Sequence, residues 1–131
     1  MAFGTLKADT LTHSTAGSLA TNYVVSNTVK VWGYLNGDNT TLYDSFGLSS
    51  VSDEAAGDIN FTMTNAMANT NYACIGASGQ DVDNEIATNF CANNGTRTTT
   101  VFQVGTGFAT SSAHGAADRD VVCPAILGDL A

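Results

Sequence analysis

DSFGLSSVSDEAAGDINFTMTNAMANTNYACIGA, residues 44–77, is the stretch that decides the fold. Within it, Ile59, Phe61 and Met63 alternate with polar residues over 58–64. Successive side chains of a β-strand point to opposite faces, so this period of two predicts a strand with one buried face. We therefore interpret the rest of the chain outward from this strand.

Weaker strand patterns lie on both sides of it. A run over 46–51 comes first, in which Phe46 and Leu48 share parity, and the turn residues 53–57 separate it from the central strand. A strand of small residues over 72–77 comes after it. Strands joined by such short loops predict a β-meander.

Composition points to the same fold class. The chain has 131 residues, which favours one domain, and only 12% of them are charged. There are 13 glycines and one proline, and Thr, Ser, Asn and Ala are abundant, so long helices lack suitable residues. We expect an all-β protein, an antiparallel β-sandwich or barrel-like meander, with one domain over 28–131. No secretory signal and no apolar run long enough for a membrane helix are expected.

The net charge of −8 restricts the partners. Four Lys and Arg residues face twelve Asp and Glu residues. Nucleic-acid binding needs a basic surface that displaces counterions, and no basic stripe is present. An anionic membrane surface is disfavoured for the same reason. We expect no nucleic-acid and no membrane partner.

The three cysteines are Cys74, Cys91 and Cys123. No CxxC pair or Cys/His spacing indicates zinc, and the odd number leaves at least one thiol free. The contexts of Cys74 and Cys123 are apolar, which is typical of small core residues. We expect structural, reduced cysteines, in keeping with assembly in a reducing cytoplasm.

The N-terminal segment 1–27 has no amphipathic period. Leu6, Leu11 and Leu19 are isolated among Thr, Ser, Ala and Gly. Such a segment cannot build its own core, so it is predicted to be an extended arm that becomes ordered against a neighbouring subunit. The three leucines are therefore candidate interface residues.

A strong strand is predicted over 28–35. One of its faces carries Val29, Val31 and Leu35. The other carries Lys30, Trp32 and Tyr34, which is unusually aromatic for a solvent-exposed surface. Packing of Trp32 and Tyr34 under a loop or at a subunit interface is the first interpretation. A platform for stacking sugars is the alternative, with contributions from Trp32, Tyr34, Tyr43 and Tyr72.

The C-terminal half is predicted to hold two more strands. One covers 97–104, is broken by the glycines at 105–107, and resumes at 108–111. The last covers 119–126, with Pro124 placing it at a sheet edge or ending it. Asp118 and Asp120 beside Arg119 are expected to be surface charges or a local ion pair.

A long polar loop is predicted over 78–95. Asp81, Asp83 and Glu85 are hard oxygen ligands that suit calcium, but the residues that follow do not fit an EF-hand loop. A solvated acidic loop is the preferred interpretation, so no metal site is expected.

No constellation indicates catalysis. His13 lies in the weak arm and His114 in a loop of small residues, without a nucleophile elbow or a cysteine partner. Nucleotide-binding glycine motifs are also missing from the sequence, so no cofactor is expected. We expect a protein that is not an enzyme.

Several stretches resemble a recurrent bacteriophage virion module. They are VKVWGYLNG at 29–37, DSFGLSSVSD at 44–53, GDINFT at 57–62, Ala66-Met67 and Asn71-Tyr72-Ala73, and GTLKADTL at 4–11 is similar to the start of such proteins. In that family a K-x-W…N-G strand and turn precede D-S-F-N-V-S-S-V-T-D. The module occurs near the ends of tail-fibre-like proteins and in short stand-alone structural proteins of aquatic phages.

The resemblance implies a β-rich homotrimer in the virion, assembled in the host cytoplasm. Because no long fibre shaft is expected in this chain and the arm suits a clamp on a shell, a capsid decoration or cement protein is the favoured placement. Its partners would be itself and the major capsid protein or another virion protein. The alternative is a tail-fibre tip or receptor-binding module, which would present the loops 78–96 and 112–118 to a host surface glycan.

Overall fold

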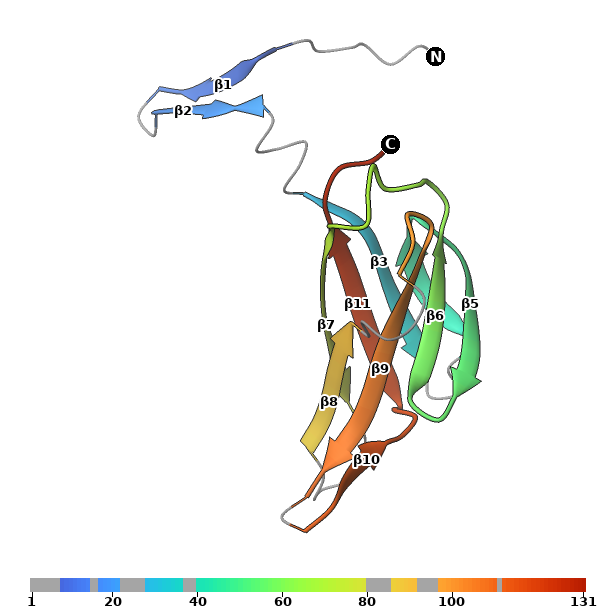
Figure 1. Ribbon diagram of the computed structural model, residues 1–131. Helices are drawn as coiled ribbons and strands as arrows, with labels where there is room; N and C mark the ends of the chain where they lie inside the picture. Colours follow the sequence, from blue (N-terminus) through green and yellow to red (C-terminus); the bar gives the residue numbers. More distant parts are fainter. Residues whose placement is uncertain are drawn as a thin grey trace.

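The computed structural model describes residues 8–14, 17–21, 28–36, 40–79, 86–91, 97–110 and 112–131. Strands dominate this part of the chain (Figure 1). They are β1 (Thr10–His13), β2 (Gly17–Ala20), β3 (Val29–Asn36), β4 (Leu42–Phe46), β5 (Leu48–Ala55), β6 (Asp58–Met63), β7 (Ala73–Gly79), β8 (Ile86–Cys91), β9 (Val101–Ala109), β10 (His114–Ala116) and β11 (Val121–Leu127). Among the described residues, no helix has the length and apolar character needed to cross a membrane.

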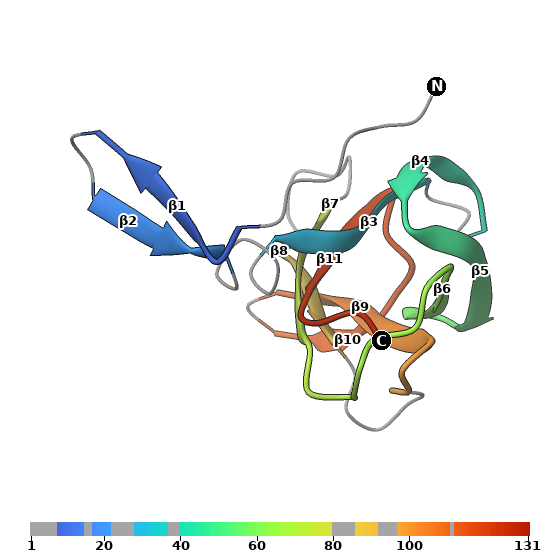
Figure 2. The ribbon, with the colours of Figure 1, turned by 90° about the horizontal axis from the view of Figure 1, so that it is seen from above.

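Two antiparallel sheets form the body of the molecule. The β3 sheet has the order β4-β3-β11-β7. In the β9 sheet, β5 pairs with β6, and β6 and β10 pair with successive parts of one edge of β9. β8 pairs with the opposite edge of β9. The two sheets lie face to face as layers (Figures 1 and 2). The predicted all-β class with antiparallel sheets is thus confirmed, and the described strands do not close into a barrel.

The predicted meander over 44–77 is wrong in its connections. Only β5 and β6 are neighbours in one sheet, whereas β4 and β7 belong to the other sheet. The chain crosses between the sheets at Gly47, whose φ of 73° is a conformation that favours glycine. This crossing places Phe46, which is 61% exposed, and Leu48, which packs against the core, in different sheets.

The predicted turn at 53–57 is also shorter than expected. β5 continues to Ala55, and the reversal is made by Ala56 and Gly57. A Cβ on Gly57 would lie 2.2 Å from the carbonyl oxygen of Thr106, so only glycine fits at this turn. The turn is thus held closely against β9.

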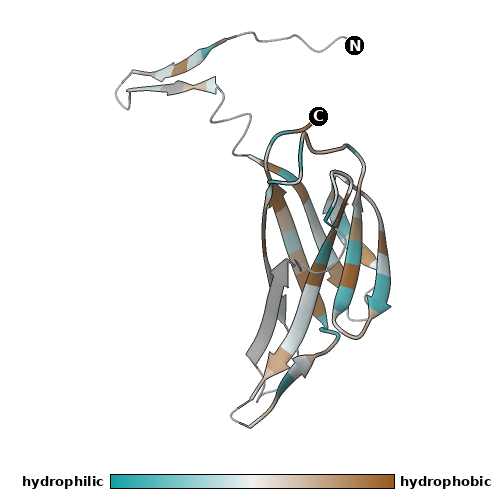
Figure 3. Cartoon of the chain, viewed as in Figure 1, coloured by the Kyte–Doolittle hydropathy of each residue, from teal (hydrophilic) through white to brown (hydrophobic). Residues whose placement is uncertain are grey.

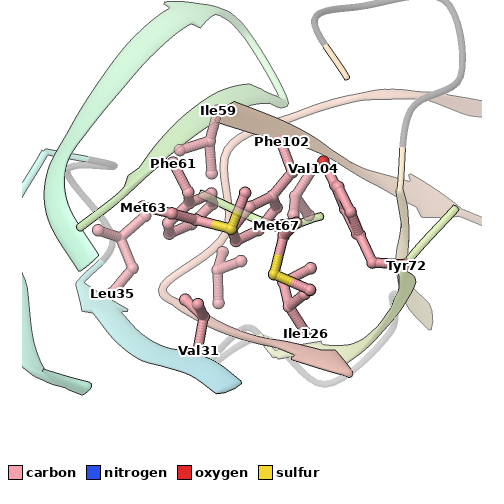
Figure 4. Packing of buried hydrophobic residues seen from close by; sticks show 11 residues of the cluster. Val31, Leu35, Ile59, Phe61, Met63, Met67, Tyr72, Phe102, Val104 and Ile126 are labelled. Carbon is pink, nitrogen blue, oxygen red and sulfur yellow. The ribbon is translucent and has the colours of Figure 1, made fainter. Parts of the chain in front are cut away.

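The core fills the space between the two sheets. The alternation along β6 is confirmed, because Ile59, Phe61 and Met63 are buried, and Figure 3 shows the hydrophobic and hydrophilic bands along this strand. Phe61 stacks on Phe102 of β9, with ring centroids 5.1 Å apart and planes 7° from parallel. Figure 4 shows these side chains meeting Val31 and other residues of the β3 sheet. The complete buried apolar set is Val31, Leu35, Ile59, Phe61, Met63, Met67, Tyr72, Phe102, Val104, Val122 and Ile126.

Tyr72 closes one end of this core and does not lie on a sugar-binding surface. It is 3% exposed, and its hydroxyl donates to the carbonyl oxygens of Thr98 (2.9 Å) and Val101 (3.2 Å). The Arg97 guanidinium lies 4.4 Å from the centre of the Tyr72 ring and donates from Nε to the carbonyl oxygen of Thr70. The contribution of Tyr72 to a stacking platform is therefore excluded by its burial.

The break expected in the next strand does not occur. β9 runs without interruption through Gly105 and Gly107, because it is paired along both edges. Thr106, between the two glycines, is buried and donates its hydroxyl to the carbonyl oxygen of Ala117 at 2.8 Å. Pairing with neighbours thus overrides the weak strand preference of glycine.

Pro124 likewise does not mark an edge. β11 lies in the middle of its sheet, between β3 and β7. Its pairing with β3 passes from Val122–Leu35 to Ala125–Trp32, and Pro124 falls in the interval between these pairs. The missing N–H of proline is accommodated by this gap in the ladder.

The charged residues before β11 hold the connection in place. Arg119 is 1% exposed and donates from Nε to the carbonyl oxygen of Gly107 at 2.8 Å. Asp118 accepts a hydrogen bond of 2.7 Å from the backbone N–H of Gly57. The expectation of a surface charge is therefore wrong for Arg119, because its side chain is buried and donates to a backbone carbonyl oxygen in place of water.

The structure also corrects the expectation of three reduced cysteines. Cys74, on β7, is disulfide-bonded, whereas Cys123 carries a free thiol whose pKa is raised by burial. Disulfide formation depends on which cysteines the fold brings within about 7 Å, and this distance is not visible in the sequence. The side chain of Cys91 lies outside the described residues.

Parts of the two predicted loops are strands. β8 lies within 78–95, and β10 lies within 112–118. The acidic residues 81–85 lie outside the described residues. The loop interpretation is therefore wrong for the residues of these two strands.

The N-terminal segment contains a separate hairpin. β1 and β2 form a two-stranded antiparallel sheet, in which Leu11 lies opposite Leu19. Figures 1 and 2 show this hairpin projecting away from the sandwich. The predicted extended arm is not confirmed, since this part of it is a hairpin.

Candidate functional site: an apolar outer face of the β3 sheet

The alternation along β3 points aromatic side chains away from the core. Val31 and Leu35 are 1% and 0% exposed, because they face the β9 sheet. Trp32 and Tyr34 lie between them in the sequence and are each 38% exposed. The pattern read from the sequence over 28–35 is thus confirmed for these four residues, whereas Val29, predicted on the buried face, is 44% exposed.

Register places one apolar row across all four strands of the sheet. Phe46 of β4 lies opposite Trp32, Trp32 lies opposite Ala125 of β11, and Ala125 lies opposite Ile75 of β7. Residues opposite each other in adjacent strands share a face. Phe46 and Ile75 are 61% and 57% exposed, so this row is accessible from solvent.

A second aromatic contact lies beside this row. The rings of Tyr34 and Tyr43 are 5.3 Å apart between centroids and are tilted by 43°. The pairing of β3 with β4 is irregular between Tyr34 and Leu35, which leaves Tyr43 outside the regular ladder. We call Trp32, Tyr34, Tyr43, Phe46 and Ile75 the aromatic face.

Charge is sparse around the aromatic face. Lys30 shares the parity of Trp32 on β3, and Asp44 lies opposite Tyr34 on β4. Lys30 donates from Nζ to the hydroxyl oxygen of Thr28, and Asp44 accepts from the backbone N–H of Ser45 at 2.8 Å. The strands β7 and β11 contribute no charged residue at all.

The outer face of the β9 sheet provides an internal reference. Asn60 of β6 lies opposite Ser52 of β5 on one side and Gln103 of β9 on the other. Thr62 lies opposite Ser50 in the same way. We call these five residues the polar face. Their side chains carry hydroxyl or amide groups, and Val101 of β9, opposite Thr62, is an apolar residue beside them. The same sandwich thus presents one mainly polar and one mainly apolar surface.

The aromatic face is comparable in size to the large apolar patches found on monomeric proteins. If an aromatic side chain has 150–250 Å² of surface, the exposed fractions of its four aromatic residues amount to roughly 300–500 Å². That is about the area of the largest apolar patch on a typical monomer, and such patches are often functional. It is less than the roughly 800 Å² that each partner buries in a standard interface, so a partner would also contact the surrounding residues.

The sequence-predicted interface residues fall into two groups. Trp32 and Tyr34 lie together on the aromatic face. Leu11 is on the hairpin and is 42% exposed, Leu19 is on β2 with its side chain outside the described part, and Leu6 lies outside the described residues altogether. Among the described strands, no ladder joins the hairpin to the β3 sheet.

Two residues of the aromatic face were missed by sequence reasoning. Phe46 was given the same parity as Leu48, and the only signal against this was the intervening Gly47. Ile75 stood in a strand otherwise made of small residues, where neither face is marked. In both cases the outward position depends on sheet membership, which the local pattern does not reveal.

Two further features of the described residues bear on chemistry, namely the surroundings of His114 and the distribution of side chains that could bind a metal ion. His114 is exposed and lines a groove of about 330 Å³ together with Asp58, Thr106 and Phe108. The described part of the chain contains no group of three or more His, Cys, Asp or Glu side chains that could hold a metal ion. The aromatic face is an accessible apolar surface, and surfaces of this kind can bind a partner.

Comparison with known proteins adds no further identification: no family model, curated protein or solved structure matches this chain.

Proposed function

We propose that this protein is a non-enzymatic structural protein of a bacteriophage virion, most specifically a trimeric capsid decoration protein. The aromatic face would contact neighbouring subunits, either further copies of this chain or the major capsid protein. The contrast between the aromatic face and the polar face carries the proposal. The sequence resemblance to phage virion modules supplies the biological setting.

Energetics favour a role in assembly. Covering roughly 300–500 Å² of apolar surface at about 25 cal/mol per Å² contributes roughly 8–12 kcal/mol before costs. Association costs about 4–15 kcal/mol in lost freedom, so one face alone gives a modest affinity. A decoration protein suits this balance, because many copies bind a repeating shell and stabilise only the assembled state by mass action.

A tail-fibre tip that binds a host glycan is the second candidate. Trp32, Tyr34 and Tyr43 supply aromatic rings, and the Asp44 carboxylate lies opposite Tyr34 as an acceptor for sugar hydroxyls. Phe46 and Ile75 weigh against it, since neither can form a hydrogen bond with a sugar. The observations therefore favour a protein partner.

The test is binding to capsids from which small proteins have been stripped. The full-length protein is added to such particles and, in parallel, to host cells and a glycan array. Stoichiometric coating of the shell, lost in Phe46→Ser and retained in the polar-face control Ser52→Ala, is the expected result. Binding to cells or glycans without binding to particles would replace decoration with the fibre-tip function.

A further inference from the structure

The β1–β2 hairpin is built as an amphipathic element. The hydroxyls of Thr12 and Ser18 are hydrogen-bonded at 3.0 Å across one side of the ladder. Leu11, at the neighbouring position of β1, has the opposite parity and is 42% exposed. One side of the hairpin is therefore satisfied by its own hydrogen bond. On the other, which carries Leu11 and which we call the leucine side, Leu11 is exposed to solvent.

The hairpin has a defined end but no sheet to support it. Thr21 closes its open end, because its N–H donates to the carbonyl oxygen of Asp9 at 2.9 Å and its hydroxyl to that of Ala8 at 2.7 Å. An isolated two-stranded hairpin is marginally stable in water unless it packs on another surface. Packing of the leucine side on another apolar surface would therefore stabilise the hairpin.

The aromatic face has the charge character that this hairpin requires. Neither β1 nor β2 contains Asp, Glu, Lys or Arg, in a chain with a net charge of −8. The four strands of the β3 sheet contain two charged residues, Lys30 and Asp44, one of each sign. Contact between the two would therefore bury apolar surface without bringing like charges together.

We propose that the leucine side of the hairpin packs on the aromatic face of a second copy of this chain. The hairpin does not cover its own aromatic face, where Trp32 remains 38% and Phe46 61% exposed, and it projects away from the sandwich (Figure 2). Such a contact is heterologous: each copy gives a hairpin and receives one, and repetition closes a ring if the rotation allows. The inference rests on the proposed function and names the partner of the aromatic face.

Trp32 makes the contact measurable without a label, because it is the only tryptophan of the chain. The full-length protein is measured by mass-resolved size analysis and by Trp32 emission over a range of concentrations. Three single variants are compared: Leu11→Asp on the hairpin, Ile75→Asp on the aromatic face, and Ser52→Asp as the exposed control on the polar face. Circular dichroism melts confirm that each variant is folded.

We expect the wild type and Ser52→Asp to associate, with a blue shift of Trp32 emission as concentration rises. Leu11→Asp and Ile75→Asp should each weaken association at least tenfold. An equimolar mixture of these two should form a heterodimer and nothing larger, because the intact hairpin of one fits the intact face of the other, and the remaining hairpin and face are both disabled.

Three results would overturn the inference. They are a monomeric wild type at all concentrations, loss of association in Ile75→Asp alone (which would mean a face-to-face contact), and failure of the two variants to combine. Particle binding is scored separately. If Leu11→Asp still coats capsids to full occupancy, the hairpin contact is not needed for decoration. The proposed function then stands although the hairpin contact has been removed.

Discussion

The two outer faces of the sandwich differ more than the two sheets that carry them. Both sheets alternate with a period of two, and both point apolar residues into one shared core. The outward positions of the β9 sheet hold Asn60, Thr62 and Gln103, whereas those of the β3 sheet hold Trp32 and Phe46. Folding requires only the inner residues to be apolar. Apolar residues on an outer face therefore point to a second requirement, which we assign to assembly.

The largest expected effect comes from the core that the two faces share. Phe61→Ala removes a fully buried ring that stacks on Phe102, so it should lower the free energy of unfolding by roughly 3–5 kcal/mol. Urea denaturation followed by circular dichroism measures the change. A loss below about 1 kcal/mol would mean that the two sheets do not depend on a common core.

Reduction of the Cys74 disulfide should have the next largest effect. A native disulfide contributes about 2–4 kcal/mol, chiefly by restricting the unfolded chain, so added reductant should lower the denaturation midpoint. In Cys74→Ala the midpoint should no longer respond to reductant. Thiol titration of the unfolded, unreduced chain should detect one thiol, and three thiols would contradict the disulfide.

Gly47→Ala tests the crossing between the sheets. An alanine there must adopt a φ near 73°, and its Cβ would lie 2.7 Å from the carbonyl oxygen of Lys30, so we expect a loss of roughly 1–3 kcal/mol. Gly17→Ala is the matched control, because Gly17 has a φ of 87° but nothing within 4 Å of the added Cβ. If both variants melt alike, the close approach at the crossing is not a source of stability.

Tyr72→Phe removes, from the end of the core, a hydroxyl donor that two carbonyl oxygens share. The hydroxyl donates to the carbonyl oxygens of Thr98 and Val101, so a loss of about 0.5–1.5 kcal/mol is expected in denaturant melts. A neutral result would show that water satisfies the two carbonyl oxygens equally well.

The same variant has a pH signature. Burial raises the pKa of Tyr72 above its ordinary value of 10.0, with the positive charge of Arg97 acting in the opposite direction. Its contribution to stability is therefore fully present below pH 10 and is lost as pH rises through the folded-state pKa, because the unfolded chain releases its proton first. Wild type should lose stability above pH 10 more steeply than Tyr72→Phe, and parallel curves would contradict this pKa shift.

The smallest expected effect on stability tests the contrast of faces most directly. Phe46→Ser on the aromatic face should change the free energy of unfolding of the monomer by less than about 0.5 kcal/mol, since the ring is 61% exposed. The same change should reduce binding to particles. A variant that loses more than 2 kcal/mol would show that Phe46 serves the fold of its own chain.

Sequence reasoning succeeded where the local pattern alone determines the outcome. The alternation of Ile59, Phe61 and Met63 predicted β6, and that of Val31 and Leu35 predicted which side of β3 is buried. Both strands are paired on each side, so the buried side of each pattern had to face the core. Trp32 and Tyr34 were then identified on the opposite side as candidate interface residues.

The failures share one physical cause, which is that tertiary pairing is not local. Phe46 and Leu48 lie two residues apart but belong to different sheets, and Pro124 lies in a central strand because the ladder has a gap there. Arg119 is buried because a carbonyl oxygen of β9 is within reach of its Nε. In each case the decisive neighbour is distant in sequence.

The aromatic face also has a consequence for the colloidal behaviour of the protein. The net charge of −8 keeps copies apart at neutral pH, although the four strands that carry the aromatic face contain only Lys30 and Asp44 as charged residues. Near the isoelectric point of about 4.1 this repulsion vanishes while the apolar surface is unchanged. The solubility of the protein therefore depends on electrostatic repulsion between whole molecules, which opposes association through the aromatic face. Mild acid or high salt would weaken this repulsion and promote self-association.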